Sequence, residues 1–257
     1  MDDARYGGKD PGSLNETIPV AWNSRRSLLK LGATLLTAPA LAGLAGHVLA
    51  APSQHQAAAQ DDILTQKGFS VALGDVQILF VDLQQALIEG SRTIPAQALA
   101  TNAAVLAKMG KLLNIPMTFS VVPVAGQPGT LVPELLPFAN DQNIFHRKPA
   151  GSFSDQAMVS ALANHRRRTL AIAGYATEVA VLQSALGAVA AGYKVQIPVD
   201  VTGSASSRTE NAAMRQMELA GAIPTTVISL AAFLTPNFSE EPGSSVLSMF
   251  SELRTVN

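Results

Sequence analysis

The segment Gln77-Ile78-Leu79-Phe80-Val81-Asp82 is the stretch of the sequence that decides the fold class. A short apolar run that ends in an acid is typical of a buried parallel strand with a polar residue at its carboxyl end. Such strands are apolar on both sides because helices cover both faces of a parallel sheet. The segment therefore predicts a central strand with Asp82 at the carboxyl edge of the sheet.

Predicted helices and strands alternate downstream of this segment. The expected helices span residues 96–113, 155–164, 177–191 and 210–220, and the expected strands span residues 117–122, 143–148, 169–174, 195–200 and 222–229. This alternation predicts an α/β fold: a doubly wound, mostly parallel sheet with helices on both faces, as in a Rossmann-like three-layer sandwich. Ligands of such sheets lie beyond the carboxyl ends of the strands. That rule points to Asp82, the segment around Lys148, and the turn at 174–180.

The composition excludes several classes of function. The 257 residues include 18 Lys and Arg and 19 Asp and Glu, which gives a net charge of −1. A chain so nearly neutral has no positively charged footprint for a nucleic-acid partner. The chain contains no cysteine, and this excludes disulfides, thiolate metal sites and cysteine nucleophiles together.

The N-terminal region resembles an export leader of the twin-arginine type. Ser24-Arg25-Arg26-Ser27-Leu28-Leu29-Lys30 opens an apolar run, and Val48-Leu49-Ala50 places small residues at the −3 and −1 positions of a cleavage site. A charged segment, a short apolar segment and small residues at the cut are the parts of a signal peptide. The resemblance implies that the twin-arginine export machinery carries the folded protein to the periplasm.

Two other interpretations of this leader are a retained membrane anchor and a basic-tipped helix of the folded domain. The apolar run contains Gly32, Pro39, Gly43 and Gly46, which are poor residues for the interior of a helix. We therefore expect a signal peptide at 1–51 and a flexible tether at 52–70. A single folded domain at 71–238 and a C-terminal tail at 239–257 are expected to follow.

Four segments inside the predicted domain carry a resemblance to a known family. They are Ile78-Leu79-Phe80-Val81-Asp82-Leu83-Gln84, residues 129–135, residues 172–181 and residues 214–222. In their order and spacing, from about Ile78 to Phe233, the chain resembles the isochorismatase-like hydrolase superfamily. That superfamily includes nicotinamidases, N-carbamoyl-amide hydrolases and isochorismatases. The resemblance implies a hydrolase of the amide or vinyl-ether type that acts on a small molecule and assembles as a homo-oligomer.

The resemblance also implies a catalytic set of an aspartate, a lysine and a cysteine. Asp82 matches the aspartate, and Lys148 matches the lysine, with Arg147 as the alternative after a shift of one residue. Ala180 stands at the position of the cysteine. No environment can activate a methyl group as a nucleophile, so the acyl-enzyme route to amide hydrolysis is closed in this chain.

What remains is a carboxylate, a cation and the N-terminal amides of the helix at 177–191, which can bind an anion or an oxyanion. Such a set permits acid–base catalysis by Asp82, as the resemblance to isochorismatases proper implies. That role requires burial to raise the pKa of Asp82 against the effect of the nearby cation. A catalytically inactive ligand-binding protein and an oligomeric scaffold are the alternatives.

Three further residues are candidates for substrate binding, namely Gln84, Tyr175 and Ala176. Gln84 has either a ligand contact or a role in its loop. The resemblance implies a cis non-proline peptide bond between Tyr175 and Ala176, and a plain turn is the alternative. Gln84 also stands where nicotinamidases carry a metal-binding histidine, and none of the four histidines has ligand spacing with a carboxylate. We therefore expect no metal and no cofactor.

Overall fold

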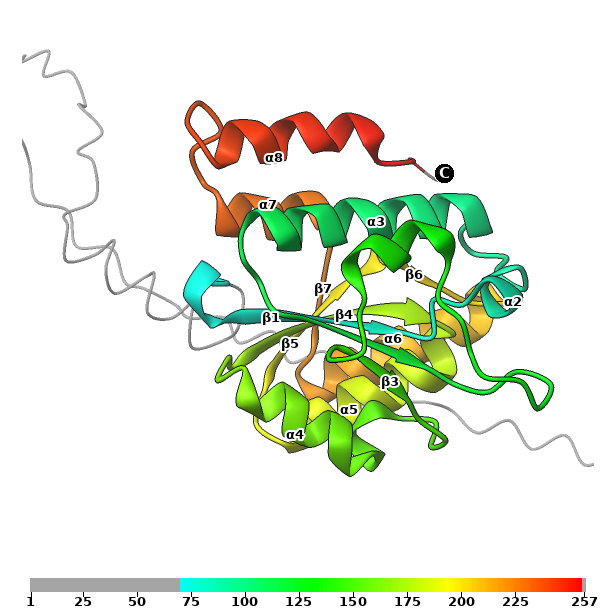
Figure 1. Ribbon diagram of the computed structural model, residues 1–257. Helices are drawn as coiled ribbons and strands as arrows, with labels where there is room; N and C mark the ends of the chain where they lie inside the picture. The colour runs from blue at the N-terminus through cyan, green and yellow to red at the C-terminus, as the bar shows by residue number, and fades with distance from the viewer. Residues whose placement is uncertain (1–69, 256–257) are drawn as a thin grey trace, which may run out of the picture. The chain divides into compact units, whose positions relative to one another are not determined.

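Parallel strands form one sheet in the computed structural model, which describes residues 70–255 of the chain (Figure 1). The strands are β1 (Val76–Val81), β2 (Met117–Val121), β3 (Ile144–His146), β4 (Thr169–Tyr175), β5 (Lys194–Pro198), β6 (Thr202–Gly203) and β7 (Ile223–Thr225). The α-helices are α2 (Gln85–Ile88), α3 (Ala96–Leu112), α4 (Gln156–Asn164), α5 (Leu182–Ala190), α6 (Ser207–Ala220), α7 (Val227–Leu234) and α8 (Gly243–Met249). Shorter helical turns are η1 (Leu73–Asp75), η2 (Pro133–Phe138), η3 (Ser152–Ser154), η4 (Thr177–Val181), η5 (Val199–Val201) and η6 (Phe250–Glu252).

The strand order confirms the predicted doubly wound sheet. The order is β3-β2-β1-β4-β5-β7, with β6 paired to β4, and every pair is parallel. β1 lies between β2 and β4, and all of its residues are buried. At its carboxyl end, Val81 pairs with Ser120 on one side and with Gly174 on the other. A Cβ at Gly174 would lie 2.2 Å from the Val81 carbonyl oxygen, so only glycine fits at this point of the sheet.

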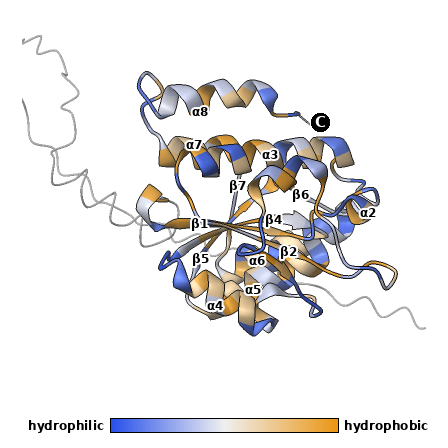
Figure 2. Cartoon of the chain, viewed as in Figure 1, coloured by the Kyte–Doolittle hydropathy of each residue, from blue (hydrophilic) through white to orange (hydrophobic). Residues whose placement is uncertain are grey.

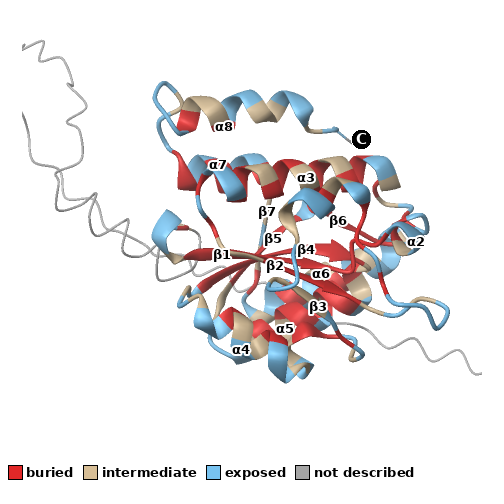
Figure 3. Cartoon of the chain, viewed as in Figure 1, coloured by how far each residue is buried: buried red, intermediate tan, exposed pale blue. Residues whose placement is uncertain are grey.

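Two helical layers cover the sheet. Ile78 and Phe80 of β1 face the layer of α3, α7 and α8, whereas Leu79 and Val81 face the layer of α4, α5 and α6. Both layers turn apolar, buried sides toward the strands (Figures 2 and 3). The alternation explains why β1 reads as an unbroken apolar run, since both of its faces pack into a core.

Two segments differ from the sequence prediction. The strand expected at 222–229 is only the three residues of β7, because Thr226 caps α7 through the backbone N–H of Ser229, and α7 begins at Val227. The segment expected to be a C-terminal tail contains α8, and Val246 of that helix is buried in the core. Helix α8 thus completes the layer formed with α3 and α7.

The expected signal peptide and most of the expected tether lie outside the described residues. Within residues 70–255, none of the helices has both the length and the apolar character that a membrane span requires.

Candidate active site

Asp82 lies at the topological switch point of the sheet, where the strand order reverses. The chain continues from β1 toward β2 and β3 on one side, and from β4 toward β5 and β7 on the other, which is where α/β sheets open a ligand crevice. Asp82 directly follows β1 with a φ of 53°, a left-handed conformation that aspartate tolerates better than most residues. Its N–H donates to the carbonyl of Ser120 at 3.0 Å, and the residue is only 4% exposed.

The cation beside Asp82 is Arg147. Its Nη2 donates to Asp82 Oδ2 at 2.5 Å, its Nη1 donates to the Pro149 carbonyl, and the residue is 1% exposed. Lys148, which the sequence predicted in this position, is exposed. The physical reason is the alternation of side chains along an extended segment: Arg147 falls on the side of Phe145, which packs against the core, and Lys148 falls on the other side. The one-residue shift that the sequence left open is therefore the arrangement in the structure.

Burial dominates the electrostatics of this carboxyl group. Removal from water raises the pKa of Asp82 from 3.8 to about 6, although the charge and the hydrogen bond of Arg147 both act to lower it. Oδ2 is bound to Arg147, whereas Oδ1 is buried and has no hydrogen-bond partner among residues 70–255. A buried carboxylate oxygen without a donor is costly, and this one is available to a proton or to a ligand.

Ala180 lies at the same end of the sheet as Asp82. It belongs to η4, which directly follows β4, the strand beside β1, and it is 3% exposed. It packs in the same core cluster as Val81. The structure thus brings the two sequence-predicted residues to adjacent strand ends, and the Ala180 side chain is a buried methyl group.

The side chains of Tyr175 and Gln84 contact other parts of the described structure. The Tyr175 side chain packs in the opposite core cluster from Ala180, and its hydroxyl lies beside Gly90. The bond between Tyr175 and Ala176 is cis, as the resemblance implied. Both polar atoms of the Gln84 side-chain amide bind the backbone of Val122. Nε2 donates to the Val122 carbonyl at 2.9 Å, and Oε1 accepts from the Val122 N–H at 2.7 Å. Gln84 therefore has the loop role that the sequence left as an alternative.

Ser120 is a residue of the site that the sequence analysis missed. It is fully buried at the end of β2, its carbonyl accepts from Asp82, and its Oγ accepts from Arg147 Nε at 3.4 Å. The sequence signal was weak, because Ser120 is one of two polar residues, with Thr118, within the apolar segment at 117–122.

Two cavities flank the loop at 126–129, close to these residues. One of about 450 Å³ is lined by Gln84 and by the uncharged segment at 127–131, together with Leu136. The other, of about 480 Å³, is lined by His146, Arg147 and Lys148 across the loop. One cavity is therefore lined by uncharged residues and the other by basic side chains, and neither Asp82 nor Ala180 is among the residues that line them.

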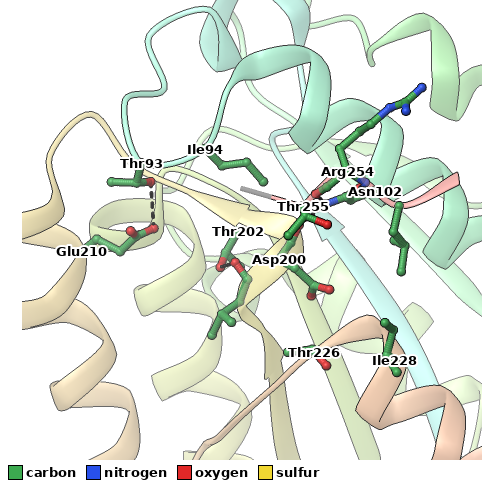
Figure 4. Close-up of a pocket in the computed structure, with 12 residues that line it drawn as sticks. Thr93, Ile94, Asn102, Asp200, Thr202, Glu210, Thr226, Ile228, Arg254 and Thr255 are labelled. Atoms are coloured by element: carbon green, nitrogen blue, oxygen red, sulfur yellow. Dashed lines mark hydrogen bonds between the residues drawn. The ribbon is translucent and has the colours of Figure 1, made fainter. Parts of the chain in front are cut away.

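A further cavity of about 380 Å³ lies beyond β5 and β6, and neither Asp82 nor Ala180 lines it (Figure 4). Thr93 donates to Glu210 Oε1 across one of its walls, and Thr177 donates to the same oxygen. Burial raises the pKa of Glu210. Thr177 is the first residue of η4, so the polar groups of this wall fix the start of the helical turn that contains Ala180.

The donor sets of the described residues do not suggest a metal centre. Among residues 70–255, no three His, Asp or Glu side chains come together in a way that would hold an ion.

Comparison with known proteins gives concordant results. The family model described as the isochorismatase domain matches residues 76–229. The "Probable hydrolase YcaC" of Escherichia coli (strain K12) is 30% identical over 149 residues, which are 58% of this chain and 72% of that protein. The solved structure of the YcaC gene product from Escherichia coli, described as an octameric hydrolase of unknown specificity, has a TM-score of 0.66 and 26% identity, and covers 72% of this chain and 90% of that one. The YcaC structure from Pseudomonas aeruginosa, with hexane-2,5-diol and covalent acrylamide, also has a TM-score of 0.66, at 23% identity, and covers 72% of this chain and 91% of that one.

Proposed function

Because the chain belongs to the isochorismatase family of hydrolase-like proteins, we propose that it hydrolyses a small molecule by acid–base catalysis at Asp82, without a cysteine nucleophile. One observation carries the proposal. A buried carboxyl group with a pKa of about 6 keeps one oxygen free while Arg147 holds the other. It lies at the edge of the sheet that also holds Ala180, the residue that the resemblance aligns with the nucleophile. A carboxyl group whose pKa lies near the working pH is suited to proton transfer.

The reaction we propose is the hydrolysis of a small amide by water. Asp82 Oδ1 takes a proton from a water molecule as the water oxygen bonds to the amide carbonyl carbon. The negative charge that develops on the carbonyl oxygen lies at the first N–H groups of the helix that starts at Thr177, as anions do at helix N-termini. The C–N bond then breaks, and Asp82 returns its proton to the leaving nitrogen. Arg147 stays charged throughout, because a guanidinium does not lose its proton in proteins.

The test is a panel of small amides and vinyl ethers assayed from pH 4 to pH 9. For an amide we expect kcat/KM to rise tenfold per pH unit up to about 6 and then level off, because the ionised form of Asp82 is the base. A vinyl ether would show the reverse, a rate that falls above about 6, because Asp82 would then act as the acid. Turnover with no change of slope between pH 5 and pH 7 would contradict a role for Asp82 in either direction.

The rival function is a small-ligand-binding protein without turnover, or an oligomeric scaffold. It is favoured by the methyl group at Ala180 and by the octameric assembly of the Escherichia coli relative. Panel members that raise the melting temperature but are not converted would support the binding protein. For either function we propose a homo-oligomer, and light scattering that gives the mass of a single chain would contradict that part.

We also propose that the twin-arginine machinery exports this protein to the periplasm, on the strength of the segment from Ser24 to Lys30. Replacing both Arg25 and Arg26 with lysine is expected to leave the full-length protein in the cytoplasm, because the paired arginines are what the export receptor reads. Fractionation of bacterial cells measures this. Recovery of the double variant in the periplasm at the level of the unaltered protein would contradict the assignment.

A further inference from the structure

The ion pair of the candidate site joins two strands that are not neighbours. Asp82 follows β1 and Arg147 follows β3, and β2 lies between them. Neighbouring strands lie about 4.8 Å apart, so the two strand ends are about 10 Å apart. The side chain of Arg147 must therefore pass over β2 before its guanidinium reaches the carboxylate.

Ser120 is the residue of β2 at the crossing. It pairs with Val81 of β1 on one side and with Phe145 of β3 on the other, which puts it level with the ends of both strands. It contacts both members of the ion pair: its carbonyl accepts from the Asp82 N–H at 3.0 Å, and its Oγ accepts from Arg147 Nε at 3.4 Å.

We propose that Ser120 is a positioning residue, whose small side chain leaves the passage through which Arg147 crosses β2 and contacts Asp82. Serine is the smallest side chain of β2, where the other residues are Met117, Thr118, Phe119 and Val121. Protein interiors are closely packed, so a larger side chain at this buried position would occupy the space that the arginine needs. At 3.4 Å the contact with Oγ is a weak hydrogen bond, so the size of the side chain matters more than its hydroxyl.

The inference deepens the proposed function, because it rests on Asp82 as the group that carries the proton. Arg147 is the charged group that acts on the pKa of Asp82, and it lowers that pKa. The neighbouring basic side chains His146 and Lys148 are exposed, so solvent screens their effect on Asp82. A larger side chain that blocks the crossing should therefore remove the effect of Arg147 on the pKa of Asp82. Burial, which raises that pKa, would then act alone.

The test is the titration of the Asp82 carboxyl carbon by NMR in the purified full-length protein. In Ser120→Val we expect the midpoint to rise by at least one pH unit above about 6, because the guanidinium is displaced. Ser120→Ala, which keeps the passage and loses the weak hydrogen bond, should shift it by less than about half a unit. Thr118→Val is the control for the loss of a buried hydroxyl at nearly constant size in the same strand, two residues before the crossing, and it should leave the titration of Asp82 unchanged.

A double variant separates positioning from general damage. If Ser120→Val acts by displacing the arginine, then adding it to Arg147→Met should not move the midpoint of Asp82 further. A midpoint in folded Ser120→Val equal to that of the unaltered protein would overturn the inference. If that variant does not fold, Ser120→Thr, which adds one methyl group, should give a smaller shift in the same direction, and a shift of zero would overturn the inference. Because the readout needs no substrate, the shift can appear in a protein that hydrolyses nothing, which would count against the proposed function alone.

Discussion

Replacing Asp82 with asparagine is expected to lower turnover about 10²- to 10⁴-fold and, at pH 8, to make the folded protein more stable by about 3 kcal/mol. Asparagine cannot carry the proton. It does keep the shape of the side chain and an oxygen for Arg147 Nη2, and it tolerates the left-handed backbone at this position. The loss of activity would therefore not come from a lost fold.

The gain in stability follows from the direction of the pKa shift. The pKa of Asp82 is raised from 3.8 to about 6 in the folded protein, so the folded state holds this proton more tightly than the unfolded state does. The contribution of this proton to the free energy of unfolding is fully present below pH 3.8 and is lost as the pH rises through about 6. A shift of about two units corresponds to about 3 kcal/mol. Asparagine imitates the protonated form at every pH and avoids this loss.

Urea unfolding at pH 4 and pH 8 measures the effect, with Asp141→Asn at an exposed loop position as the matched control. The advantage of the Asp82 variant should be large at pH 8 and nearly absent at pH 4, whereas the control should stay within about 0.5 kcal/mol at both. An Asp82→Asn protein that is less stable at pH 8 than the unaltered chain would show that Arg147, not burial, sets the state of this carboxyl group.

The sequence predicted the site residues that lie at the ends of buried strands, because the strands themselves can be recognised from local patterns. The position of Asp82 follows from the apolar run before it, because the end of a buried parallel strand is also the edge of the sheet. The turn at 174–180 follows in the same way from the end of β4, and the resemblance then selected Ala180 within it. These elements were predicted because strand hydrophobicity and helix periodicity are local properties of the chain.

The choice between Arg147 and Lys148 depends on packing across strands. Two adjacent cations at the end of a strand differ by one residue, and that difference selects the face of the sheet to which each side chain points. The register of β3 against β2 settles it, and no local pattern records that register. Ser120 was missed and the two roles of Gln84 were left open for the same reason, since their partners lie on other strands and loops.

Replacing Arg147 with methionine is expected to destabilise the protein by an amount that grows with pH. Methionine is flexible enough to fill the space of the lost side chain. The Pro149 carbonyl and Ser120 Oγ lose their donor, which costs about 1–2 kcal/mol at every pH. Without the guanidinium, only burial acts on Asp82, so its pKa rises further above about 6.

The pH dependence is what distinguishes this ion pair from ordinary packing. At pH 5 Asp82 is mostly protonated in both proteins, so the electrostatic part of the difference is small. Above pH 6 the unaltered protein ionises while the variant keeps its proton, and the difference in unfolding free energy should grow by about 1.4 kcal/mol per pH unit until the variant's own pKa is reached. Lys148→Met is the matched control, because it removes the adjacent exposed cation, and it should change stability by less than about 0.5 kcal/mol throughout. A difference for Arg147→Met that is equal at pH 5, 7 and 9 would mean that the arginine contributes packing alone and that the protonation of Asp82 is set without it.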